Sequence, residues 1–243
     1  MDKKNEVLSI LVEALDLPQQ LDSIEFTDTV KNLEIELGNR EFTYNIRQGM
    51  LPCVSINITN TLQKTTPNFK SLMQGFFTSK WMKERSLARR WTEQQLAERI
   101  VEKSAYCFLE ERQSYYQDHG LYLAIYGATI MAFPCRNQFV VLAVCCPFID
   151  IEEFYENEEA RLEWFLNLYQ EYTFKLIGIG SGTLIFKFIN PIKEPKVLLE
   201  KLMSLKPDEI GLVKDGIVWC NEKMEMLAEE LPFAGAIIRL WWD

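Results

Sequence analysis

The sequence predicts an α+β protein, with mixed or antiparallel sheets, flanking helices and a helical segment in the middle of the chain. Three observations predict this class. Several short runs are apolar throughout or alternate apolar with polar residues, as strands do. Other runs repeat apolar residues every three or four positions, as helices do. Short polar or glycine-bearing turns join neighbouring strand-like runs, which indicates hairpins.

The chain has 243 residues, enough for one large domain or two small ones. We expect a division near residue 120, into an N-terminal α+β region (1–118) and a C-terminal α+β domain (121–243) that ends in Trp-Trp-Asp. The net charge of −9 argues against a general affinity for nucleic acids or anionic lipids. The longest apolar stretches fall short of the ~20 residues that span a bilayer, so no membrane association is expected.

Six cysteines occur without a C-x-x-C pair, and the first residues lack the apolar core of a secretory signal. We therefore expect reduced thiols in a cytoplasmic protein. The chain contains a single histidine, which removes His-rich zinc sites. We expect neither a metal ion nor a cofactor.

The first part of the chain reads as a helix over 3–16 that ends at Leu17-Pro18. The alternating runs 33–37 and 41–46, on either side of Gly38-Asn39-Arg40, predict a hairpin. A third strand is expected over 53–58, followed by a polar loop.

The middle of the chain reads as helical, with short segments over 69–77 and 79–90. Thr92 and Gln95 form a capping box that opens a long helix, and Asp118-His119-Gly120 is a typical C-terminal stop.

The C-terminal part begins with two apolar runs, 121–133 and 138–148, which predict a hairpin of central strands around residues 134–137. An amphipathic helix is expected over 151–172, then a hairpin of 174–179 with 183–189. A helix opened by Pro195, a helix from Asn221 to Leu231 and a final strand over 236–242 complete the chain.

The glycines of Gly178-Ile-Gly-Ser-Gly182 resemble a phosphate-binding loop, but such a loop must lead into a helix N-terminus. A strand-like run follows instead. We interpret these glycines as the turn of the hairpin, where glycine tolerates positive φ.

A basic segment over residues 80–91 contains Trp81 and Trp91 and carries five bases against one acid, Glu84. Bases beside aromatic residues suit phosphate contacts and base stacking. The alternative is a solvated helix face that pairs with acids elsewhere in the fold. The candidate nucleic-acid or anion-binding residues are Lys80, Lys83, Arg85, Arg89 and Arg90.

Seven acids and one base lie between residues 150 and 163. A helix cannot direct these acids onto one ion, so a calcium site is not expected. A solvated helix face is the simplest interpretation, and a docking surface for a basic partner is the functional one. The candidate partner-binding residues are Glu152, Glu156 and Glu159.

A cysteine-dependent enzyme would have to use His119, the only histidine, together with Cys107 or Cys135. The place of His119 just before Gly120 suits a helix C-terminal side chain better. We predict no catalytic residues.

The C-terminal part, about 121–243, resembles a bacterial family known only as domain of unknown function 4253. The features that match are an aromatic helix around Trp164, the glycine-bearing turn before a strand, Asn190-Pro191, Leu227–Leu231 and the terminal Trp-Trp-Asp. The family has no established activity, so this resemblance implies a fold and a boundary. The order of elements is also similar, more loosely, to that of secretion-chaperone-like sensory regulators.

The sequence therefore predicts a non-catalytic cytoplasmic protein that acts through protein–protein contact, as an inhibitor or immunity-type partner of a basic protein. A nucleic-acid-associated module that uses residues 80–91 is the first alternative. A cysteine-dependent enzyme is the second.

Overall fold

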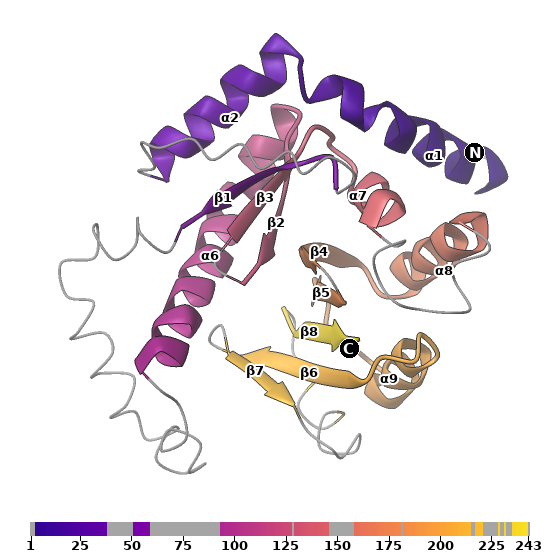
Figure 1. Cartoon of the computed structure of the whole chain (residues 1–243). Helices are drawn as coiled ribbons and strands as arrows, with labels where there is room; N and C mark the ends of the chain where they lie inside the picture. Colours follow the sequence, from indigo (N-terminus) through magenta and orange to yellow (C-terminus); the bar gives the residue numbers. More distant parts are fainter. Residues whose placement is uncertain are drawn as a thin grey trace.

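The computed structural model describes residues 3–37, 51–58, 93–127, 129–145, 158–180, 182–214, 217–220, 228, 231 and 235–242. Within these residues it contains six helices and one mixed sheet of eight strands, which confirms the α+β class (Figure 1). The helices are α1 (Lys3–Gln20), α2 (Ile24–Glu36), α6 (Glu93–Asp118), α7 (Gln138–Cys145), α8 (Glu158–Glu171) and α9 (Pro195–Met203). The strands are β1 (Val54–Asn57), β2 (Tyr122–Tyr126), β3 (Thr129–Phe133), β4 (Phe174–Gly180), β5 (Thr183–Phe188), β6 (Glu209–Lys214), β7 (Ile217–Cys220) and β8 (Ile237–Trp241).

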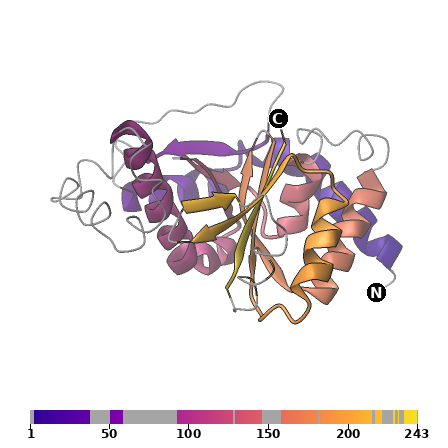
Figure 2. The same ribbon diagram turned by 90° about the horizontal axis from the view of Figure 1, so that it is seen from below.

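The strands of the sheet follow the order β1-β3-β2-β4-β5-β8-β6-β7. The pair β2–β4 is parallel, with Ile125 opposite Gly178, and the other pairs between described strands are antiparallel. The parallel pair joins the hairpin β2–β3 to the hairpin β4–β5, so it lies at the centre of the sheet. Helices cover the sheet on both sides (Figure 2).

One side of the sheet, which we call the α8 face, packs against α1, α7, α8 and α9. Alternate strand residues point to it, such as Tyr122 and Ala124 of β2 and Leu184 and Phe186 of β5. The helices add buried apolar side chains, such as Val7 of α1. The opposite side, the α6 face, packs against α2 and α6.

Strand β4 contains an irregularity between Leu176 and Gly178. Because it shifts the alternation of side chains by one residue, Phe174, Leu176 and Ile179 all lie on the α8 face. Gly178 lies opposite Ile185, and a Cβ at this glycine would approach the Ile185 side chain to 2.6 Å. Glycine is therefore required for close packing at this position.

The side chain of Gln138, at the start of α7, links the helix to β4. Its amide donates to the carbonyl of Phe174 (3.2 Å) and accepts from the backbone N–H of Leu176 (2.8 Å). The hydroxyl of Tyr122 donates to the carbonyl of Leu176 (2.6 Å). Strand β4 is joined to β2 by only one residue pair. These bonds give hydrogen-bond partners to the backbone N–H and carbonyl groups of β4 in this region.

The predicted strand over 33–37 is wrong, because these residues lie at the C-terminal end of α2 and just after it. Ser23 caps this helix by accepting a hydrogen bond from the N–H of Phe26 (3.2 Å). The residues Phe26, Val30 and Leu33 are buried at helical spacing, whereas Ile35 is 75% exposed. The alternation of apolar and polar residues over 33–37 fits a strand. Over the longer run 24–36, however, the buried residues recur at helical spacing, and the segment forms a helix.

The predicted hairpin of 121–133 with 138–148 is also wrong. The run 121–133 is itself a hairpin, β2–β3, in which Gly127 takes a positive φ of 56°. The second run forms α7, whose N-terminus is capped by Asn137, since its side-chain oxygen accepts from the N–H of Phe139 (3.0 Å). Helix α7 contacts α1, α8 and β4, so it is apolar on nearly every side and lacks a helical period.

Other elements agree with the sequence expectations. Strand β1, the end of α6 at Asp118, the hairpin β4–β5, the proline-opened helix α9 and strand β8 are confirmed. Helix α1 continues through Pro18 to Gln20, beyond the expected stop. Strands β6 and β7 were not predicted. The expected strand 41–46, the helical segments 69–77 and 79–90, and the start of the helix 151–172 lie outside the described residues.

Strands from both sides of residue 120 belong to the same sheet, because β1 pairs with β3. The α8 face likewise combines Val7 and Ile10 of α1 with residues of the C-terminal part. The boundary between 1–118 and 121–243 stays a prediction, and the described strands form one continuous sheet across it.

Candidate functional site

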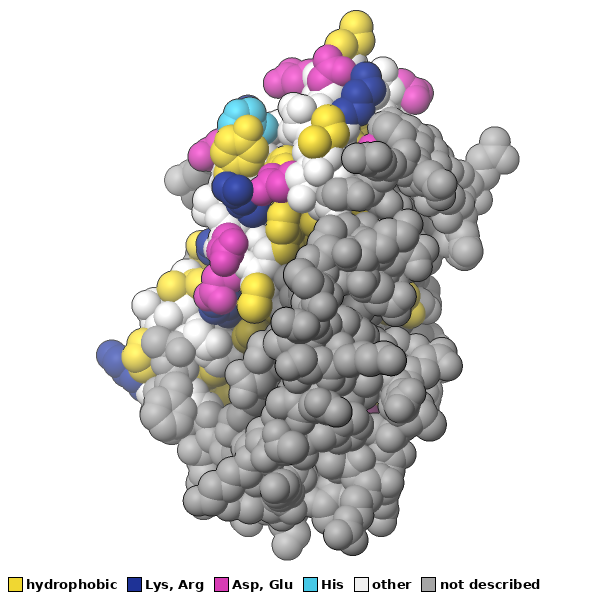
Figure 3. Space-filling model, turned by 90° about the vertical axis from the view of Figure 1, so that its left-hand side faces the viewer, with side chains coloured by type: hydrophobic (Ala, Val, Ile, Leu, Met, Phe, Trp, Pro, Cys, Tyr) yellow, Lys and Arg dark blue, Asp and Glu magenta, His cyan; other side chains and the backbone are white. Residues whose placement is uncertain are grey.

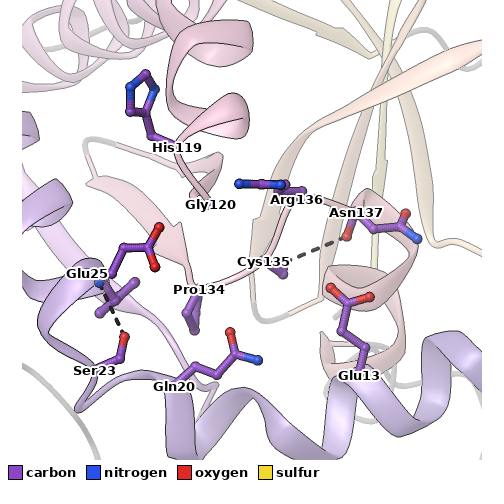
Figure 4. Close-up of a pocket in the computed structure, with 11 residues that line it drawn as sticks. Glu13, Gln20, Ser23, Glu25, His119, Gly120, Pro134, Cys135, Arg136 and Asn137 are labelled. Atoms are coloured by element: carbon purple, nitrogen blue, oxygen red, sulfur yellow. Dashed lines mark hydrogen bonds between the residues drawn. The ribbon is translucent and has the colours of Figure 1, made fainter.

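A cavity of about 420 Å³ opens between four segments of the chain (Figure 4). Two of these segments are helix α1 and the start of α2, and the other two are the links α6–β2 and β3–α7. The volume lies within the range of small-molecule sites. The lining combines two carboxylates, Glu13 and Glu25, with the guanidinium of Arg136 and the imidazole of His119.

Local sequence signals position this lining. Gly120 takes a positive φ of 85°, so the chain can leave α6 and enter β2. The carbonyl of Arg136 accepts from the side-chain amide of Gln117 (2.6 Å), which fixes the link β3–α7 against the end of α6. Burial raises the pKa of Glu13, a partly buried carboxylate of α1.

The cavity brings His119 and Cys135 to one place, which is the pair that a cysteine enzyme would require. They form no hydrogen bond with each other. The thiol of Cys135 donates to the carbonyl of Asn137 (3.7 Å), and Nδ1 of His119 lies 2.7 Å from the carbonyl oxygen of Tyr115. Figure 4 shows the imidazole pointing away from Cys135.

The electrostatics of Cys135 also oppose a nucleophilic role. Burial raises the pKa of its thiol well above the usual range, and the charge of Glu13 raises it further. A thiol in this environment stays protonated at neutral pH, and the protonated form is a poor nucleophile. Cys107, the other cysteine considered for this chemistry, is exposed on α6 and does not line the cavity.

The acids predicted to bind a partner are placed only in part. Glu152 and Glu156 lie outside the described residues. Glu159 lies in the first turn of α8 and is exposed, and Glu163, one turn later, is exposed as well. On the inner side of the same helix, Leu162 and Phe165 are 1% exposed.

All five predicted nucleic-acid or anion-binding residues, Lys80, Lys83, Arg85, Arg89 and Arg90, lie outside the described residues. That assignment stays a prediction. On the side of the molecule seen in Figure 3, hydrophobic, acidic and basic side chains of the described residues are interspersed.

One surface feature was missed from the sequence, the outer side of α1. Leu8, Val12 and Leu15 are 41%, 59% and 78% exposed, although the inner side of this helix is already apolar. Their spacing of four and three residues was visible in the sequence. The run contains apolar residues on two opposite sides of the helix, so spacing alone could not show which side is buried.

Among the described residues, no group of three or more His, Cys, Asp or Glu side chains is arranged to hold a metal ion. None of the described helices is both long and apolar enough to cross a membrane. Comparisons of the chain with protein-family models, with curated proteins and with solved structures found no match. The resemblance of 121–243 to domain of unknown function 4253 therefore stays a prediction.

Proposed function

We propose that this protein acts by binding a basic partner protein through the acidic outer side of α8. One observation carries the proposal: the exposed acids of α8 fall into two groups. Glu158 pairs with Arg161 (3.8 Å), and Glu171 pairs with Lys201. Glu159 and Glu163 form no ion pair with any residue that the structure describes.

Two like charges four residues apart on a helix destabilise it by about 0.2–0.5 kcal/mol. A cation from a partner relieves this repulsion at Glu159 and Glu163. The other two acids, Glu158 and Glu171, already pair with cations of the chain itself. The acids stand on a rigid support, because Leu162, Phe165 and Leu166 of the inner side are at most 3% exposed. A charged pair held in this way needs little reorganisation on binding.

The charge of the whole chain supports the same partner chemistry. A net charge of −9 attracts a basic protein at long range, and this attraction weakens as salt rises. When α8 covers the functional surface of its partner, binding blocks the activity of that partner. This is how an inhibitor or immunity-type protein acts.

The test compares two charge-reversed variants that change the net charge equally. Glu159→Lys with Glu163→Lys reverses the proposed surface, and Glu111→Lys with Glu200→Lys reverses exposed acids on α6 and α9. Proteins captured from a lysate are identified at about 50 mM and about 500 mM salt. We expect basic proteins to bind the wild-type chain and the control variant at low salt, and to be lost from the α8 variant.

An α8 variant that retains the same basic proteins as the wild type would remove the proposal. Loss of binding in both variants would show that only net charge matters, which also contradicts a specific role for α8. Circular dichroism spectra of the two variants must match that of the wild type for the comparison to count.

A further inference from the structure

We propose that the outer side of α1 is an interface between two copies of this chain, which pair their α1 helices in antiparallel orientation. The occupant of this surface is therefore a second copy. The proposal uses no residue of α8, so it is independent of the proposed function.

The apolar side chains on the outer side of α1 form a narrow stripe. At 3.6 residues per turn, Leu8, Val12 and Leu15 fall within an arc of about 60°. They are 41%, 59% and 78% exposed, while Val7, Ile10 and Leu17 on the inner side are at most 4% exposed. The inner side alone accounts for the packing of α1 against α7 and α8. The fold of the monomer does not use the outer stripe.

A charge of opposite sign lies at each end of this stripe. Lys4 is one turn before Leu8, and Asp16 is one turn after Val12. Both side chains are exposed, and neither forms an ion pair with another described residue. The remaining exposed side chains on this side of the helix are uncharged: Asn5, Ser9 and Gln19.

This order of charges selects the second copy and its orientation. In an antiparallel pair about a two-fold axis at the level of residue 10, Lys4 lies opposite Asp16 of the second copy, and Leu8 lies opposite Val12 of that copy. Symmetry makes each contact twice, which is the property of an isologous interface. A parallel pair would instead place Lys4 against Lys4 and Asp16 against Asp16, and repulsion between like charges disfavours it.

The contact is small, because each copy supplies three apolar side chains and two charges. Interfaces below about 1,200 Å² are typical of weak or transient association. We therefore expect a dimer whose dissociation constant is about 10–500 µM and increases as salt rises.

Sedimentation velocity of the full chain over that range of concentration tests the interface. The variants Lys4→Asp and Asp16→Lys each place like charges at both ends of the pair, and we expect each to weaken the dimer about tenfold. The double variant Lys4→Asp/Asp16→Lys exchanges the two charges and restores opposite-sign contacts. We expect the dissociation constant of its dimer to lie within about threefold of the wild-type value.

Leu15→Ser removes the most exposed apolar side chain of the stripe and should also weaken the dimer. Val197→Ser on α9 is the matched control, since Val197 is 38% exposed on another helix. A wild-type chain that stays monomeric up to about 500 µM overturns the interface. A double variant that dimerises no better than the single variants also overturns the interface. Exchange of the two charges restores opposite-sign contacts only when the two α1 helices are antiparallel.

Discussion

The two faces of the sheet are built from different kinds of side chain. The α8 face holds a cluster of aromatic rings, in which Phe186 lies 4.9 Å from Phe174 and 6.0 Å from Phe165 between ring centroids. Its bridging polar side chain, Gln138, uses both its amide nitrogen and its amide oxygen. On the α6 side, Glu34 of α2 and Gln113 of α6 are each 5% exposed and keep buried polar atoms without a hydrogen-bond partner.

The difference teaches that the two faces contribute differently to stability. Apolar burial with satisfied polar groups stabilises a fold, whereas a buried polar atom without a partner costs about 1–3 kcal/mol. On the α6 side this cost is offset in part by Glu36, which accepts a hydrogen bond from Tyr116 (2.6 Å) and pairs with Arg112. We therefore expect the α8 face to supply most of the stability and the α6 side to tolerate, or gain from, substitution.

The largest expected effect is on the aromatic cluster of the α8 face. Phe186→Ala should lower the free energy of unfolding by about 3–5 kcal/mol, because it leaves a cavity between Phe165 and Phe174. Urea denaturation followed by circular dichroism measures this change. A loss below about 1 kcal/mol would contradict the central place of this cluster.

The second effect concerns the bridging amide of the α8 face. Gln138→Met keeps the length of the side chain but leaves the N–H of Leu176 and the carbonyl of Phe174 without their partner. We expect a loss of about 2 kcal/mol in the same denaturation experiment. Hydrogen exchange of the Leu176 amide should become faster, and an unchanged rate would show that the bridge does not protect β4.

The same substitution on the α6 side should have the opposite sign. Gln113→Met replaces an amide whose nitrogen and oxygen are both buried without a partner. We expect the variant to be more stable than the wild type by about 0.5–1 kcal/mol, since the desolvated polar atoms are removed. If Gln113→Met destabilises as much as Gln138→Met, the contrast between the faces is wrong.

The smallest effect is a pH dependence at Glu34. Burial raises the pKa of this carboxyl, so the folded protein holds the proton more tightly than the unfolded chain. Stability is therefore lost as pH rises from the ordinary pKa through the raised one.

Glu34→Gln removes this titration, so we expect it to be more stable than the wild type at pH 7, by less than about 1 kcal/mol. The two proteins should converge near pH 4, and thermal unfolding across that range measures the difference. Glu111→Gln, at an exposed position on α6, is the control for the loss of one carboxylate. A Glu34 variant that is less stable than the wild type at pH 7 would contradict the sign.

The sequence predictions were correct where an element is decided by interactions between neighbouring residues, and wrong where it is decided by contacts with distant parts of the chain. The hairpin β4–β5 and helix α9 were predicted from glycine and proline at their turns and starts, which act locally. The C-terminal end of α2 and the whole of α7 were misread as strands. For α2, the burial of Phe26 and Val30 against distant residues selected the helix. For α7, contacts with α1, α8 and β4 removed the helical period that the sequence would otherwise show.

The candidate sites divide in the same way. The exposure of Glu159 was expected from the amphipathic pattern of its helix, and the structure places it at the surface. The cavity beside Glu13 and Arg136 could not be expected, because it is lined by four segments that are far apart in the sequence. The pairing state of acids on α8 was also hidden, since Lys201, the partner of Glu171, comes from another helix.

By itself the sequence determined the α+β class, the acidic character of the chain and those elements whose ends carry local signals, such as Gly120 and Pro195. Only the tertiary structure decided the order of strands, the identity of α2 and α7, and which of the two apolar sides of α1 remains exposed. The physical reason is that caps and turns depend on neighbouring residues. Burial depends on which distant surface a segment meets, and that surface exists only once the chain has folded.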